Sequence, residues 1–177
     1  MVFTTLIIGA LILALILLIR RFQRGAYLIS GVMDAPSPVR AAAKRAGFKA
    51  QPNVHSIVSI HSADLCVAAM AVAFANMDSN RPADAETIEQ SLQKHLQLDA
   101  RTTEDFCVLS PWLVDQGGGP TPAFERLTKR LKQLDHGPYF GKMMNVLGDV
   151  TAAGTKGMPS AAQADAMGAL ARIFRTA

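Results

Sequence analysis

The sequence predicts an all-α protein in which a single N-terminal transmembrane helix precedes a compact bundle of about six helices. Three observations support this class. The first 19 residues carry no charge. Alanine and leucine are abundant, while runs of β-branched residues are scarce after the N-terminus. Apolar residues recur three or four apart along most of the remaining chain, which is the period of a helix with one buried face.

The chain of 177 residues divides into three predicted parts. Residues 1–22 form the membrane anchor, residues 23–60 a basic juxtamembrane linker, and residues 61–177 a helical domain. The last two parts together hold enough chain for one domain with a real core. Two cysteines are too few for a disulfide-stapled scaffold or a cysteine-rich zinc module.

The apolar segment at residues 1–19 is expected to cross the membrane once. Its 19 residues would span about 28 Å as a helix, close to the hydrocarbon thickness of a bilayer. A cleaved signal peptide, which is the alternative, needs basic residues before the apolar run. Here Arg20, Arg21 and Arg24 follow the run and none precedes it. The positive-inside rule therefore places the domain in the cytoplasm, behind a single-pass anchor in the inner membrane.

The positive charge of the protein is concentrated beside this anchor. Residues 20–49 hold seven basic residues and one acidic residue, whereas the rest of the chain holds eleven basic and thirteen acidic residues. Lipid headgroups are therefore the expected partner of the basic segment, and nucleic acid is not. A short helix predicted at residues 39–46 carries Arg40, Lys44 and Arg45 on one side. Two interpretations remain open for it: a solvated linker, or a basic helix resting on anionic lipid.

The first helices of the domain follow from their apolar pattern. Residues 65–75 are uninterruptedly apolar and too short to span a bilayer, which predicts a central helix buried on all sides. A helix from Asp84 to about residue 96 has that aspartate as its N-cap. The next helix is expected over residues 103–116, with a kink or a split at Pro111. The glycines at 117–119 end it.

Three amphipathic helices complete the predicted bundle. The first spans residues 124–134, and the second spans residues 140–150. The third begins at Ser160, whose spacing to Gln163 is that of a capping box. Its inward side chains are expected to be Ala164, Met167, Leu170 and Phe174.

No catalytic motif indicates an enzyme, and no cofactor is expected. One loop is a weak candidate for a metal site, because oxygen-bearing side chains occupy positions 1, 3, 7, 9 and 12 of an EF-hand-like window: Asp78, Asn80, Asp84, Glu86 and Glu89. Proline and alanine stand at positions 5 and 6, where the chain of a calcium loop must turn sharply. We therefore expect turn and cap roles for these residues, with weak divalent-cation binding as the alternative.

The same region resembles a known family. Residues 71–78, the following loop with Pro82, and the acidic helix resemble the repeated "Ala-Asp-Gly, loop, Pro, Glu, helix" unit of TerB-like domains from tellurite-resistance proteins. A second copy would begin at residues 150–154, so the resemblance covers residues 62–174. It implies an all-α fold with two-fold internal similarity and acidic metal ligands. In the second copy Ala153 stands where the acid is expected, which leaves that site incomplete.

The leading functional hypothesis is a non-enzymatic, membrane-anchored helical adaptor that binds a partner protein at the cytoplasmic face. Two alternatives remain. The protein could be an ion-responsive protein of the tellurite or metal stress type with a weak divalent-cation site. It could also be an accessory subunit of a larger membrane complex, with the anchor as its assembly contact.

Overall fold

The computed structural model describes residues 32, 35–51, 53–78, 83–135, 137–154 and 157–175. These residues form seven α-helices and no β-strand, which confirms the all-α class. The helices are α2 (Ser37–Arg45), α3 (Ala63–Ala75), α4 (Ala85–Leu96), α5 (Ala100–Gln116), α6 (Pro120–Leu134), α7 (Tyr139–Ala153) and α8 (Ala161–Arg175). Within the described residues, no helix is both long and apolar enough to cross a bilayer. The predicted anchor at residues 1–22 lies outside them.

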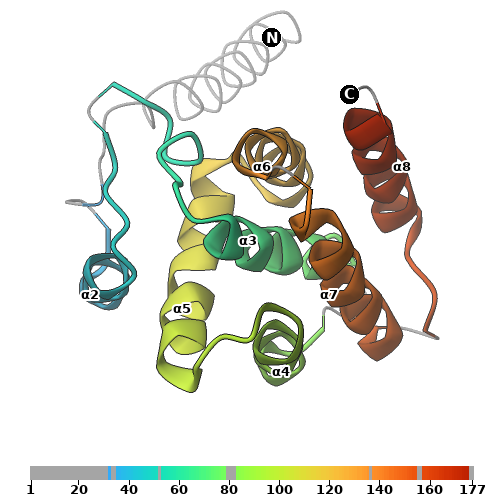
Figure 1. Cartoon of the computed structure of the whole chain (residues 1–177), viewed down its shortest axis with the longest axis horizontal. Helices are drawn as coiled ribbons and strands as arrows, with labels where there is room; N and C mark the ends of the chain where they lie inside the picture. Colours follow the sequence, from blue (N-terminus) through green and yellow to red (C-terminus); the bar gives the residue numbers. More distant parts are fainter. Residues whose placement is uncertain are drawn as a thin grey trace, which may run out of the picture.

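Helix α3 is the centre of the bundle (Figure 1). All residues from 65 to 75 are buried, and α4, α5, α6 and α7 pack around them. The helix begins at Ser62, whose Oγ accepts a hydrogen bond from the Leu65 amide at 3.2 Å. A helix enclosed on all sides needs no polar face. The uninterrupted apolar run thus predicted both the helix and its central place.

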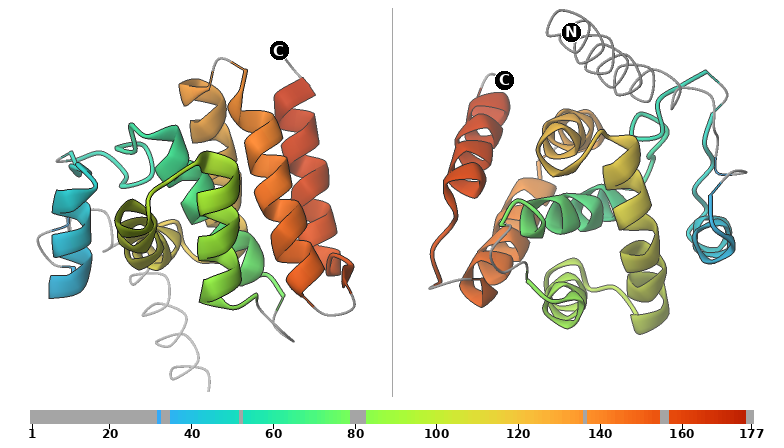
Figure 2. Two further views of the ribbon diagram at one scale, coloured as in Figure 1. Left: turned by 60° about the horizontal axis from the view of Figure 1, so that its bottom comes forward. Right: turned by 180° about the vertical axis from the view of Figure 1, so that it is seen from behind.

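Helix α2 packs against α5 and contributes to the same core. Its buried side chains are Val39, Ala42 and Ala43, and the loop after it adds Phe48, Ile57 and Ile60. Residues of the predicted linker at 23–60 therefore share a core with the predicted helical domain at 61–177. In Figures 1 and 2, α2 and α8 lie at opposite ends of the molecule.

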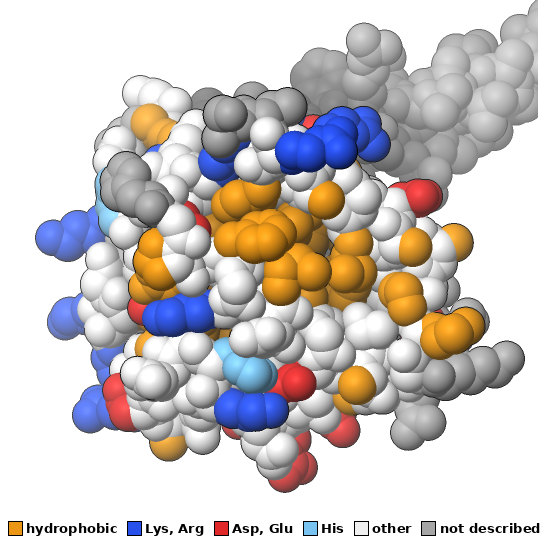
Figure 3. Space-filling view, turned by 45° about the vertical axis from the view of Figure 1, so that its right-hand side comes forward, with side chains coloured by type: hydrophobic (Ala, Val, Ile, Leu, Met, Phe, Trp, Pro, Cys, Tyr) orange, Lys and Arg blue, Asp and Glu red, His pale blue; other side chains and the backbone are white. Residues whose placement is uncertain are grey.

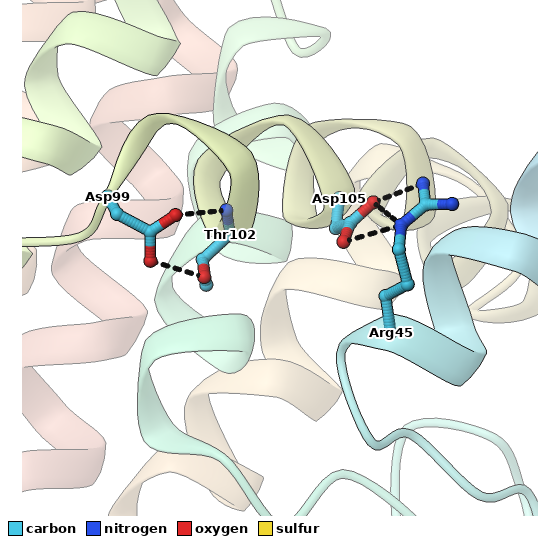
Figure 4. A network of polar contacts seen from close by, with 4 residues as sticks. All are labelled: Arg45, Asp99, Thr102 and Asp105. Carbon is cyan, nitrogen blue, oxygen red and sulfur yellow. Dashed lines mark hydrogen bonds and ion pairs between the residues drawn. The ribbon is translucent and has the colours of Figure 1, made fainter.

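Helix α5 begins earlier than expected and continues through its proline. Asp99 is the N-cap, because its carboxylate accepts hydrogen bonds from the Thr102 amide at 2.9 Å and the Thr102 hydroxyl at 2.7 Å (Figure 4). Pro111 lies inside the helix on its exposed side. Proline removes one backbone hydrogen bond of the helix. Leu109 and Leu113 on the opposite side are fully buried, and their packing stabilises the helix despite this loss. Of the two predicted effects of Pro111, a kink or a split, the split is therefore wrong, and the kink stays a prediction.

The glycine run turns the chain sharply from α5 into α6. Gly118 and Gly119 have φ angles of +88° and +104°, which glycine adopts without steric cost. At Gly117 an added Cβ would lie 2.5 Å from the Ala123 Cβ, so the two helices approach more closely than a side chain would allow. The predicted stop at residues 117–119 is confirmed.

The last three helices follow the predicted pattern with one exception. On α8 the capping box is present: the Gln163 amide donates to Ser160 Oγ at 3.3 Å, and the Ser160 amide donates to Gln163 Oε1 at 2.9 Å. Gln163, Ala166 and Leu170 are the buried residues of α8, whereas Ala164 is exposed. The prediction of an inward Ala164 is wrong, because the capping glutamine takes the inward position instead.

Candidate functional site

A groove of about 300 Å³ lies between α6 and α8. Phe124 of α6 and Leu170 of α8 lie at its base and are themselves buried, whereas Ile173 of α8 is partly exposed. Figure 3 shows one face of the molecule, on which apolar side chains gather with lysine and arginine side chains close by. The residues that line the groove are Thr121, Phe124, Glu125, Thr128, Ala162, Asp165, Ala166, Ala169, Leu170 and Ile173. An apolar pocket with a few polar groups is the usual form of a binding site.

The groove exists because α8 presents small side chains to α6. Ala162, Ala166 and Ala169 recur along one side of α8 and leave the space open. On α6 the facing Thr128 is buried, and its hydroxyl donates to the Phe124 carbonyl within the same helix at 2.8 Å. Neither helix therefore supplies a side chain that fills the gap.

Contacts on both sides of the groove hold α8 in place. Near its start, Gln163 Nε2 donates to the Phe74 carbonyl of α3 at 2.9 Å. Near its end, Lys132 Nζ of α6 donates to the Ile173 carbonyl at 2.6 Å. The Phe174 ring also packs on Phe140 of α7, with centroids 5.0 Å apart. Because α8 is held at both ends, the space between α6 and α8 is a feature of the fold.

The charged residues that line the groove are both acidic. Glu125 and Asp165 are exposed, and no lysine, arginine or histidine is among the lining residues. Glu125 accepts a hydrogen bond from Lys129 Nζ at 2.7 Å, and this contact lowers the pKa of the carboxyl. Asp165 makes no hydrogen bond or ion pair with any residue that the structure describes. Its carboxylate can therefore accept a contact from a ligand without losing one in the protein.

The metal candidates do not converge among the described residues. Asp84 caps α4 through the Thr87 amide at 2.8 Å, and Glu86 accepts from the Gln90 amide group at 3.1 Å. Asp78 is buried, Glu89 lies further along α4, and Asn80 is outside the described residues. No group of three or more potential metal ligands occurs in the part of the chain that the structure describes.

The predicted basic residues divide into three sets. Arg20, Arg21 and Arg24 lie outside the described residues, whereas Arg40 and Lys44 are exposed on α2. Arg45 differs from both because it holds α2 to α5. Its guanidinium donates to Asp105 through Nε at 2.9 and 3.0 Å and through Nη2 at 2.5 Å (Figure 4). The Asp105 side chain is only 6% exposed, so this ion pair has a structural role.

A second polar cluster joins α4 to α7. Ser91 Oγ donates to Asp149 Oδ2 at 3.0 Å, His95 Nε2 lies 2.9 Å from the same oxygen, and Lys94 Nζ lies 3.6 Å from it. Partial burial opposes ionisation of Asp149, but the hydrogen bonds with His95 and Ser91 and the charges of Lys94 and His95 together lower its pKa. The serine contacts the carboxylate and not the histidine, so the three residues lack the arrangement of an activated nucleophile. Sequence spacing could not reveal this cluster, because its members lie more than 50 positions apart.

Neither cysteine has the environment of a reactive thiol. Burial raises the pKa of Cys66 to about 12, and its thiol donates to the Leu127 carbonyl at 3.3 Å. Burial, together with the charge of Glu89, also raises the pKa of Cys107 to about 12. Reactive cysteines have lowered pKa values and positive surroundings, so these two serve as small core residues.

No family model, curated protein or solved structure matches this chain. The resemblance to TerB-like domains therefore stays a prediction. Asp78 and Gly154, which belong to the two copies of that resemblance, lie near one another, since a Cβ added to Gly154 would be 3.9 Å from Asp78 Oδ2.

Proposed function

We propose that the protein is a non-enzymatic, membrane-anchored helical adaptor with a TerB-like domain, which binds a partner protein at the cytoplasmic face of the inner membrane. The groove between α6 and α8 is the observation that carries this proposal. It is mainly apolar, has two exposed acidic residues among its lining residues, and lies beside a helix that is held at both ends. A rigid apolar pocket with a polar rim is suited to binding a small group of side chains from another protein.

Two exposed basic residues of α2 support the membrane part of the proposal. Exposed Arg40 and Lys44 lie on α2, which is at the opposite end of the molecule from α8 (Figure 1). With α2 beside anionic lipid, a partner could reach the groove without competing for the membrane surface. A reporter fused after residue 177 is expected to be cytoplasmic. A reporter located on the outer side of the membrane would contradict the charge argument.

Purification of the full chain in mild detergent tests partner binding. In Ala169→Trp the indole fills the groove, whereas in Ala171→Trp it stands on the exposed side of α8 as a matched control. We expect a protein to co-purify with the wild type and with Ala171→Trp, and to be lost with Ala169→Trp. Equal melting temperatures of the two variants would show that both fold. Recovery of the same protein with all three chains would exclude the groove as the binding site.

A further inference from the structure

We draw no further inference here: the strongest candidate, the groove between α6 and α8, belongs to the site already described, and nothing among the described residues shows the chemistry of what would cover it.

Discussion

Replacing Phe74 with alanine should remove the largest single contribution at the centre of the bundle. The Phe74 side chain is 0% exposed and packs against the Phe124 ring, with centroids 5.8 Å apart. Truncation of a buried phenylalanine costs about 3–5 kcal/mol, because both burial and the contacts around the new cavity are lost. The total stability of a domain is only about 5–15 kcal/mol. The variant should therefore retain little stability at 37 °C.

Thermal unfolding of the full chain in detergent, followed by circular dichroism, measures this effect. For a domain of this size, each kcal/mol lowers the melting temperature by about 2–4 °C, so Phe74→Ala should melt about 10 °C lower or more. Met158 is 67% exposed, and Met158→Ala is the matched control with an expected change near zero. A shift of only a degree or two for Phe74→Ala would show that α3 is not the centre of the core.

Three further predictions follow from individual contacts. The pKa of Asp149 is lowered in the folded protein, so ionised Asp149 stabilises the fold above about pH 4, and this stabilisation is lost as the pH falls through the pKa of the folded state. In urea titrations the wild type should therefore lose stability below about pH 4 more steeply than Asp149→Asn. Equal slopes would show that the carboxylate has no role in α4–α7 packing. Arg45→Ala leaves buried Asp105 without its guanidinium, so amide hydrogen exchange in Ser37–Arg45 should accelerate about tenfold while α6 is unchanged. Exchange at the wild-type rate would mean that apolar contacts alone hold α2. Calcium at millimolar concentration should leave the melting temperature nearly unchanged, whereas a site with a hundredfold excess over its Kd would add about 2.7 kcal/mol. A stabilisation of that size, abolished by Asp78→Ala, would favour the ion-responsive alternative.

Most of the helices could be predicted because their signals are local. The apolar run of α3, the N-cap of α4 and the capping box of α8 each depend on residues within one or two turns. The start of α5 was missed although Asp99 and Thr102 are a local cap signal, because the apolar pattern begins only later at Phe106. Local signals thus predict the presence of a helix better than they predict the residue at which it begins.

The groove could not be predicted because it depends on tertiary packing. Its two sides are separated by the whole of α7, and the alanines of α8 carry no signal by themselves. Arg45 illustrates the same limit: its basic character suggested a lipid contact, but its partner Asp105 lies 60 positions away. Contacts of this length become visible only when the helices are placed in space.

Photo-crosslinking in cells tests partner binding at the groove most directly. A photoreactive amino acid at position 169 would lie in the groove, and the same residue at position 171 would lie on the exposed side of α8. We predict that one partner protein becomes covalently linked from position 169 and not from position 171. Equal crosslinking from both positions, or none from position 169, would contradict an adaptor that binds its partner through this groove.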